Sequence, residues 1–569
     1  MKLDMVVRES VASYIVRLLC SRSSLPLAGL LSLVTVTEMC QSTTADERLF
    51  LKAPTAVVRD RFGWDVALDG NVAVSTTFAD QNGQPGATYL MDALDGSLIH
   101  KVSASDGNSN DYFGFAAAID GNTLVVGDPV DPFLAAKPGS IYIYNATTGV
   151  QQPKVFATDS TAGDEFGFDV SVSGNRILVG APQRGNRPGA AYVVDASNPS
   201  SQVKLTPSGA FSGDDFGYSV AIDGNLAAVG SSVNYKIIGE MTGGSLYLFD
   251  ATTGAELHRL KPSDTAVNDE FGWSVALDGE LAIVGAPHQG VGKGVAYLFN
   301  TTTGAQLNRI TAPVSVDGDD FGYAVDMQNG LAVIGAPAGD GVPSHVYVYD
   351  TASGEMVREL IPHVATTNRE YGFAVSMDGG RVLVGAPTLN VDGKIAAGAS
   401  YTFCVLLGDA DCDGQLGLPD IDELVTEIVS GTHDSQFDMN NDMLVDKDDL
   451  DAWLMTAGER NLGAGQSYEY GDANLDGIVN DDDFALWNQG KFTSQSKWSQ
   501  GDFSANGHID VTDFNIFNER RAGGPLPTWQ VPEPALGVAF WLLLGVMVRS
   551  QRHSSFQVRR ADRLPSLKG

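Results

Sequence analysis

An aromatic residue followed by glycine recurs seven times at intervals of 50 to 55 residues, and this period constrains the fold more than any other feature of the chain. The aromatic residues of these pairs are Phe62, Phe113, Phe166, Phe216, Phe271, Phe321 and Tyr371. Thirteen residues after the glycine of each pair an apolar run ends, at Thr76 in the first copy and at a second glycine in the others. These second glycines are Gly127, Gly180, Gly230, Gly285, Gly335 and Gly385. Such a period is typical of one supersecondary unit repeated many times.

Each repeat has the pattern of four short strands joined by tight turns. In the fifth repeat, the turn Asp278-Gly279 separates two apolar segments, and Thr302-Thr303-Gly304 separates two more. The four segments are residues 274–277, 281–284, 295–299 and 307–310. Turns of this kind favour antiparallel hairpins over crossover connections. The repeats therefore predict an all-β, seven-bladed propeller over residues 46–407.

The two ends of the repeat region are complementary. The seventh repeat runs through Tyr401-Thr402-Phe403 and then lacks its fourth strand, whereas Leu49-Phe50-Leu51-Lys52 precedes the first Phe-Gly pair. A strand exchanged between the ends would close the ring and leave no exposed sheet edge. We therefore expect residues 49–52 to complete the seventh blade.

The Phe-Gly pairs and the later Gly-Ala-Pro sequences resemble the FG-GAP repeats known from integrin α-subunit propellers and from many bacterial surface proteins. The resemblance covers residues 46–407. Integrin-type repeats often carry a calcium loop between the Phe-Gly strand and the Gly-Ala-Pro strand. Here a short turn such as Leu277-Asp278-Gly279 joins them, so we expect no calcium in the blades. We expect each repeated Phe to be wedged between blades and each repeated Gly to lie where backbones approach.

The net charge is −34, from 70 acidic and 36 basic residues. A surface of this sign repels nucleic acid and anionic lipid and attracts divalent cations. We therefore expect no nucleic-acid partner. For the propeller, the simplest interpretation of the charge is a well-solvated surface.

Four acidic loops with the spacing of a twelve-residue calcium loop follow Leu407. Oxygen-bearing side chains stand at alternate positions, position 7 offers a backbone carbonyl, and a carboxylate stands at position 12. Gly at position 6 permits the sharp turn, although Met443 stands there in the second loop and Gly417 stands at position 9 of the first. The candidate calcium ligands are Asp409, Asp411, Asp413, Gln415 and Asp420; Asp438, Asn440, Asp442, Leu444, Asp446 and Asp449; Asp472, Asn474, Asp476, Ile478, Asn480 and Asp483; and Asp502, Ser504, Asn506, His508, Asp510 and Asp513.

An apolar residue follows position 12 of every loop, and the pattern after the first loop (Ile421, Leu424, Val425, Ile428) predicts an amphipathic helix. One helix after each loop, with Asp at position 12, resembles dockerin type I repeats. The resemblance implies a small α-helical, EF-hand-like region in two pairs, 408–460 and 461–524, with calcium as its cofactor. It also implies a possible cohesin-like partner. The alternative is that calcium only folds this region.

Both ends of the chain have the composition of targeting segments. Basic residues, an apolar run at 25–36 and a polar stretch predict a signal peptide over residues 1–45, with an uncleaved N-terminal anchor as the alternative. At the other end, Pro532-Glu533-Pro534, the apolar segment 535–548 and a basic tail resemble the PEP-CTERM sorting signal. Over residues 525–569 that resemblance implies recognition by an exosortase-type enzyme and a surface location in a Gram-negative-type bacterium. The alternative is a C-terminal membrane anchor.

No residue stands out as catalytic. The histidines are scattered, no Gly-x-Ser-x-Gly sequence occurs, and the acidic residues before Phe-Gly recur in most blades, which indicates a repeated turn. The sequence therefore predicts an exported calcium-binding surface or matrix protein whose propeller binds a protein or a glycan. The alternatives are a component of a polysaccharide-degrading system and a structural spacer. The ligand, the binding face and the pairing of Cys404 with Cys412 stay open.

Overall fold

The computed structural model describes residues 47–521, apart from 78–84, 108–111, 130–136, 183–187, 210–213, 233–242, 265, 267, 315, 339–341, 364–369, 441 and 495–496. Two compact units are present, the first extending to Gln415 and the second beginning at Leu416. The predicted signal peptide (1–45), sorting signal (525–569) and apolar segment 535–548 lie outside the described residues. Within the part of the chain that is described, no helix is long and apolar enough to cross a membrane.

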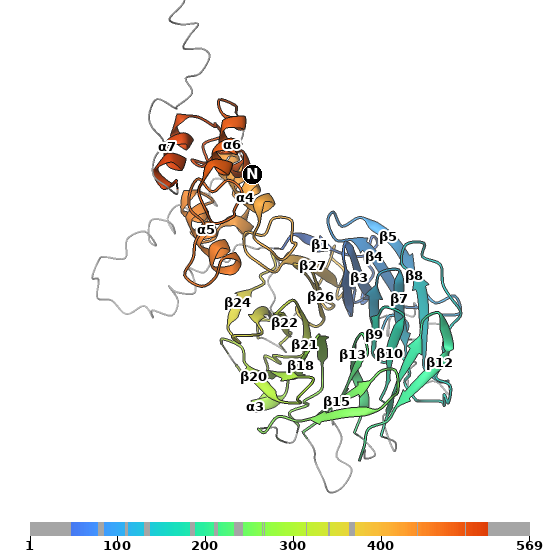
Figure 1. Ribbon diagram of the computed structural model, residues 1–569. Helices are drawn as coiled ribbons and strands as arrows, with labels where there is room; N and C mark the ends of the chain where they lie inside the picture. The colour runs from blue at the N-terminus through green and yellow to red at the C-terminus, as the bar shows by residue number, and fades with distance from the viewer. Residues whose placement is uncertain are drawn as a thin grey trace, which may run out of the picture. The chain divides into compact units, whose positions relative to one another are not determined.

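The first unit contains seven small antiparallel sheets, and Figure 1 shows them arranged around a common axis as propeller blades. Blade 1 consists of β2 (Val66–Asp69), β3 (Val72–Thr77), β4 (Ala87–Asp92) and β5 (Leu98–Val102). Blade 2 consists of β6 (Ala117–Asp120), β7 (Thr123–Asp128) and β8 (Ser140–Asn145). Blade 3 consists of β9 (Val170–Ser173), β10 (Arg176–Ala181), β11 (Ala190–Asp195) and β12 (Asn198–Leu205). Blade 4 consists of β13 (Phe216–Asp223), β14 (Leu226–Ser231), β15 (Ser245–Asp250) and β16 (Glu256–Leu260). Blade 5 consists of β17 (Val275–Asp278), β18 (Leu281–Ala286), β19 (Val295–Asn300) and β20 (Gln306–Ile310), and the short helix α3 (Gln289–Gly292) lies between β18 and β19. Blade 6 consists of β21 (Ala324–Gln328), β22 (Leu331–Ala336), β23 (His345–Asp350) and β24 (Met356–Glu359). Blade 7 consists of β25 (Val375–Asp378), β26 (Arg381–Ala386), β27 (Ala399–Cys404) and β1 (Leu49–Leu51).

The seven-bladed propeller predicted from the repeats is confirmed. In blade 5, the four strands match the four predicted segments to within two residues at each end. The strands form because apolar residues fill both faces of the inner strands, and two-residue turns such as Gly279-Glu280 reverse the chain between the first two strands.

Ring closure by the N-terminal segment is also confirmed. β1 pairs with β27 in antiparallel register, with Leu49 opposite Thr402 and Leu51 opposite Ser400. The first strand of the chain thus completes the last blade, so the ring has no open edge at this seam.

Blade 2 departs from the four-strand expectation. Its outer segment makes only two isolated bridges to β8, through Gln151 and Val155. Pro153 stands between these two residues and has no N–H to donate to a strand ladder. The segment therefore follows β8 without forming a regular fourth strand.

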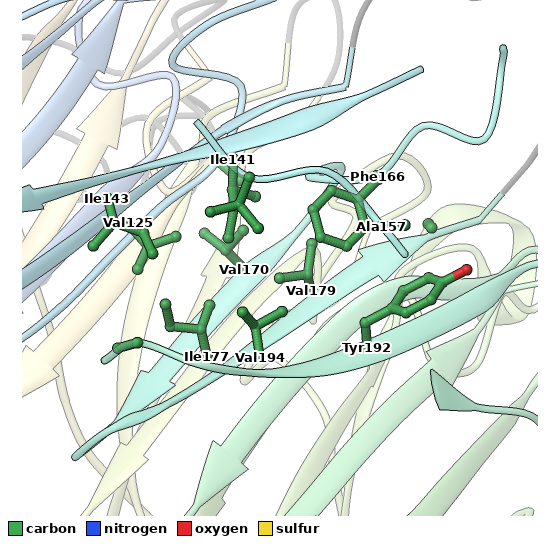
Figure 2. Packing of buried hydrophobic residues seen from close by; sticks show 14 of the residues in the cluster. Val125, Ile141, Ile143, Ala157, Phe166, Val170, Ile177, Val179, Tyr192 and Val194 are labelled. Atoms are coloured by element: carbon green, nitrogen blue, oxygen red, sulfur yellow. The ribbon is translucent and has the colours of Figure 1, made fainter. Parts of the chain in front are cut away.

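The apolar core lies between neighbouring blades. Figure 2 shows the cluster between blades 2 and 3, in which Ile141 and Ile143 of β8 pack against residues of blade 3 such as Val170 and Val179. Equivalent clusters join blades 1 and 2, 3 and 4, 4 and 5, 5 and 6, and 7 and 1. Every Phe or Tyr of the Phe-Gly pairs is at most 1% exposed, and the six phenylalanines belong to these clusters, which confirms their predicted packing role.

The repeated glycines lie where backbones of adjacent blades approach. A Cβ added to Gly285 would lie 1.9 Å from the carbonyl oxygen of Gly322, which belongs to the next Phe-Gly pair. The same contact closes the ring, because a Cβ at Gly385 would lie 2.2 Å from the oxygen of Gly63. Only glycine fits such an approach, so the position is architectural.

The second unit is helical. Its elements are α4 (Leu418–Ser430), η1 (Ser435–Phe437), α5 (Lys447–Asn461), α6 (Asp481–Gly490), η2 (Trp498–Gln500) and α7 (Val511–Arg520). A helix thus begins within each predicted loop, as expected, and Trp453, Trp487 and Phe517 are fully buried on the predicted apolar faces. Ser499 donates two hydrogen bonds to Asp422 of α4, which connects the segments that follow the first and third loops.

Candidate functional site

A cavity of about 840 Å³ runs along the propeller axis and is lined by the first strands of all seven blades. In each described blade, the connection between the first two strands has two residues, whereas the connection between the second and third strands has 8 to 13. In an antiparallel meander the longer connections all lie at one end of the strands. The cavity therefore has one plain end and one end surrounded by long loops, where binding residues usually lie.

Seven aromatic side chains form a closed ring in this cavity, at the looped end of the first strands. Each stands two residues after the aromatic residue of a Phe-Gly pair, and each is partly exposed. Centroids of neighbouring rings are 4.7 to 5.8 Å apart. The members of this aromatic ring are Trp64, Phe115, Phe168, Tyr218, Trp273, Tyr323 and Phe373. The sequence analysis missed this ring, although the signal exists, because the residue after each Phe-Gly pair is always Trp, Phe or Tyr.

Below the aromatic ring, side chains of one blade accept hydrogen bonds from backbone N–H groups of the next. Asp65 accepts from Ala117 at 2.7 Å, and Asp169 accepts from Val220 at 2.6 Å. The innermost strand of a blade has an unpaired edge, so these bonds satisfy N–H groups that would otherwise lack a partner. Burial raises the pKa of Asp65 and of Asp169 to about 7.

A second set of such bonds surrounds the plain end of the cavity. Asp69 accepts from the N–H of Gly121, and Asp378 accepts from the N–H of Gly70, which carries the pattern across the seam. The pKa of Asp69 is raised by burial and by the nearby charges of Asp378 and Asp120. These carboxylates therefore have a structural role in holding blades together.

The residue directly before each Phe or Tyr lies at the looped end. Six of these residues have left-handed φ angles between 47° and 58°. The carbonyl of Glu270, for example, accepts a hydrogen bond from the N–H of Trp273, so the predicted repeated turn is confirmed. Glu270 is buried, and its carboxylate lies 2.6 Å from Nδ1 of His288. That hydrogen bond raises the pKa of His288.

The charges that line the cavity have a single sign. Its described lining includes nine carboxylates and no Lys, Arg or His. Aromatic faces and carboxylates both attract cations. The cavity is therefore chemically suited to a group that carries positive charge.

The four predicted loops share one hydrogen-bond pattern. The carboxylate at position 1 accepts from the N–H groups of positions 5 and 6, as Asp472 does from Asp476 at 3.1 Å and Gly477 at 2.8 Å. The side chain at position 5 accepts from the N–H of position 7, as Asp476 does from Ile478. The equivalent bonds in the other loops involve Asp409, Asp413, Gln415; Asp438, Asp442, Leu444; and Asp502, Asn506, His508.

The end of each loop forms the start of a helix. Asp446, Asn480 and Asp510 at position 9 are the N-caps of α5, α6 and α7. The carboxylate at position 12 accepts from the N-cap N–H, at 2.8 Å for Asp449, Asp483 and Asp513. In α4 the same bond joins Gly417 to Asp420. The second, third and fourth loops thus also form capping boxes, whereas Gly417 of the first loop has no side chain to complete one.

The loop carboxylates at positions 1 and 12 are buried. Asp472, Asp483, Asp502 and Asp513 are 0% exposed. Burial, together with the charge of Asp483 or Asp513 in the same loop, raises the pKa of Asp472 and of Asp502 to about 6. Burying two like charges in one loop is costly unless a cation or protons compensate them.

The first loop brings three carboxylates together. Carboxylate oxygens of Asp409, Asp411 and Asp413 lie within 4.8 Å of one another. Cys412, at position 4, forms a disulfide with Cys404, which settles the pairing that the sequence left open. Left-handed φ angles at position 6 are present in all four loops, including 69° at Met443.

The remaining predicted ligands occupy position 3. Asn440 and Asn474 each accept from the N–H of position 5, whereas the Ser504 hydroxyl contacts Asp502 at 3.5 Å. In the first loop, the carboxylate of Asp411 likewise accepts a hydrogen bond from the backbone N–H of Asp413 at position 5.

Comparison with protein families identifies the repeats. Five segments match the FG-GAP repeat: residues 97–144, 150–194, 199–249, 255–299 and 305–349. Each matched segment begins near the outer strand of one blade and ends with the third strand of the next, so a sequence repeat is shifted by one strand relative to a blade. No curated protein matches the chain. Five segments of this seven-bladed β-propeller thus match the FG-GAP repeat.

Proposed function

We propose that this chain is an exported, calcium-binding protein of the cell surface or extracellular matrix, whose propeller binds a protein or glycan ligand at the looped end of its cavity. The observation that carries the binding proposal is the closed aromatic ring in a cavity lined with carboxylates. An FG-GAP propeller is consistent with ligand binding.

The chemistry of the cavity favours a ligand that presents an ammonium or guanidinium group. Opposite centroids in a regular ring of seven with this spacing are roughly 11–12 Å apart, which leaves room for one extended side chain or sugar unit between aromatic faces. Such a cation gains from the aromatic faces and from Asp65 and Asp169 below them. A Lys or Arg side chain and an amino sugar share this chemistry.

Calorimetric titration tests the proposal and separates the two sources. The probes are Nα-acetyl-lysine amide and a glucosamine oligomer, with the N-acetylated oligomer as the neutral control. We expect one of the cationic probes to bind and Trp273→Ala to weaken it about tenfold. Leu257→Ala, at an exposed position of β16, should leave binding unchanged. Failure of both cationic probes to bind, or equal affinity for the neutral oligomer, would contradict the cationic assignment.

We further propose that the four loops bind calcium and that this binding folds the helical unit. The donor set fits, because oxygen-bearing side chains stand at positions 1, 3 and 5 of each loop and position 6 makes the required turn. Bound calcium would compensate the buried carboxylates at positions 1 and 12. With Asp at position 12, we expect Kd values on the order of 10⁻⁴–10⁻³ M, as in extracellular modules.

Asp472→Asn removes the first ligand of the third loop and should abolish binding there. Its control is Asp482→Asn, an exposed residue in the first turn of α6 that is absent from the ligand set. Calorimetry should count one calcium fewer for Asp472→Asn and no change for Asp482→Asn. An unchanged count in both variants would refute the assignment of this loop.

The proposed location rests on the targeting segments. A signal peptide and a PEP-CTERM-like tail imply export, processing by an exosortase-type enzyme, and transient or permanent membrane attachment through residues 535–548. The Cys404–Cys412 disulfide fits an oxidising compartment. Fractionation of cells that express the full chain or a variant lacking residues 532–569 tests this, since only the full chain should become surface-attached.

The helical unit also supports the second candidate, a part of a polysaccharide-degrading system that docks through a cohesin-like partner. Turnover of a polysaccharide by the purified protein would favour this candidate over a binding protein. Capture of a cohesin-like partner only in the presence of calcium would support the docking part alone.

A further inference from the structure

The seam of the propeller is a short strand pairing that joins the two ends of the ring. β1 contributes three residue pairs to blade 7, as many as β24 contributes to blade 6, whereas the outer strands β5, β12, β16 and β20 contribute four or five to their blades. Because these three pairs join the two ends of the ring, their loss would open blade 7 and expose the edge of β27. Contacts that reinforce this seam therefore matter more than equivalent contacts elsewhere.

The chain folds back to the seam directly after β27. Cys404 is the last residue of that strand, and its disulfide partner Cys412 lies eight residues further on. The Cα atoms of the two residues are 4.9 Å apart, and both side chains are at most 7% exposed. The intervening residues are thus held beside the end of β27.

Two arginines reach this segment from either side of the seam. Arg48, directly before β1, donates from Nη2 to the carbonyl of Ala410 at 3.1 Å. Arg381 of β26 donates from Nη2 to the carbonyl of Asp411 at 3.2 Å and from Nη1 to the carbonyl of Ala93 at 3.5 Å. Ala93 follows β4, so Arg381 also joins blade 7 to blade 1.

The backbone of the segment also packs closely on blade 7. Val405 donates its N–H to the carbonyl of Gly380 at 2.7 Å. A Cβ at Gly380 would lie 2.0 Å from the backbone nitrogen of Gly414. The segment therefore contacts the turn between β25 and β26 in addition to the two strands of the seam.

We propose that residues Cys404–Gly414 form a clasp that keeps the propeller ring closed, and that the disulfide makes this clasp sensitive to redox conditions. A dithiol reductant would transfer two electrons and two protons to the disulfide, so that the S–S bond breaks, two cysteine thiols form, and the reductant becomes a disulfide. Cys412 then loses its covalent cross-link to Cys404 at the end of β27, and Arg48 loses a fixed acceptor. The seam opens locally while the other blades stay folded.

Hydrogen exchange on the full chain tests the clasp. The protein is measured with and without a phosphine or dithiol reductant, in the presence of a calcium chelator, so that metal binding by Asp409 does not contribute. We expect reduction to accelerate exchange at least about tenfold in β1 and β27. Exchange in β17–β20, on another part of the ring, should change less than twofold.

The variant C404S/C412S should show fast exchange at the seam without reductant and no further response to it. This variant also controls for effects of the reductant at Cys20 and Cys40. Unchanged exchange in β1 and β27 after complete reduction would overturn the proposal, as would equal acceleration in all blades. Because wild-type protein is reduced after folding, the test holds even where the variant fails to fold.

Discussion

Buried aspartates occur in both units of the molecule, but their surroundings differ. In the propeller, Asp65 and Asp169 lie at inner strand edges of different blades, and each accepts a backbone N–H group of the next blade. In the helical unit, Asp472 and Asp483 lie fully buried in the same loop, and each raises the cost of charging the other. A single buried carboxylate can be satisfied by the fold itself, whereas a pair needs a cation or a proton.

The two units also differ in the interactions that stabilise their folded state. Six clusters of apolar side chains hold the blades together. The second unit is smaller, and the three loops that lie wholly within it, which start at Asp438, Asp472 and Asp502, bury carboxylates at positions 1 and 12. The comparison teaches that the propeller should fold without metal and that the helical unit should depend on it.

Chelation of calcium should have the largest effect and tests this comparison directly. With a chelator present, the helical unit should lose its cooperative unfolding transition and its helical circular dichroism, whereas the propeller transition should stay in place. Each loop contributes about 2.7 kcal/mol when calcium is present at 100 times its Kd. Calorimetric scans of the full chain check this. Loss of the propeller transition as well would break the comparison.

Substitution of Gly285 should have the next largest effect, and it acts on the propeller alone. Gly285→Val places side-chain atoms against the backbone oxygen of Gly322, which cannot move without shifting a blade. We expect a loss of at least about 3 kcal/mol in the free energy of unfolding.

Gly279→Ala in the same blade is the control for Gly285→Val. Gly279 has a φ of 55° but no atom within 4 Å of an added Cβ, so only about 1 kcal/mol of backbone strain is expected. Equal losses for the two variants in urea denaturation would contradict the close approach of blades.

The pH dependence of the propeller should reveal its buried carboxylates. The pKa of Asp65 is raised to about 7, so the folded state holds a proton that the unfolded state releases near pH 4. Its contribution to stability is therefore present below pH 4 and is lost as the pH rises toward 7. Asp65→Asn should nearly match wild type at pH 4 and be more stable by up to about 4 kcal/mol at pH 8, since the pKa is raised by about three units and each unit corresponds to about 1.4 kcal/mol.

Asp95→Asn provides a control of opposite sign. Hydrogen bonds from Ser97 hold the pKa of the exposed Asp95 below its usual value, so its contribution is present above pH 4 and is lost as the pH falls. The variant should therefore be less stable than wild type at neutral pH. Thermal unfolding from pH 4 to 8 checks both variants, and the same sign for both would contradict the burial argument.

The smallest expected effect sharpens the comparison within the helical unit. Met443 has a φ of 69° where the other three loops have Gly. Met443→Gly should relieve about 1 kcal/mol of strain and strengthen calcium binding by the second loop. Leu444→Gly is the control, because this residue lies outside the left-handed region and should gain nothing. Calcium titration distinguishes the two variants.

The fold of the propeller could be read from the sequence to within a few residues. The pattern in each repeat depends on neighbours a few positions apart, namely alternating apolar residues and Gly-containing turns, so strands such as β18 and β19 fall where the pattern predicts. The missing strand at one end and the extra strand at the other likewise predicted the pairing of β1 with β27. The four helices after the loops were predicted for the same local reason.

Only the tertiary structure could decide which residues of different repeats meet. Trp64 and Phe373 lie at opposite ends of the propeller sequence, yet their rings are 4.8 Å apart because the ring closes. The disulfide of Cys404 with Cys412 and the reach of Arg381 to blade 1 also depend on how the last blade meets the first. Local sequence determines strands and turns through short-range sterics, whereas the curvature of the packed ring decides which side chains share a cavity or a seam.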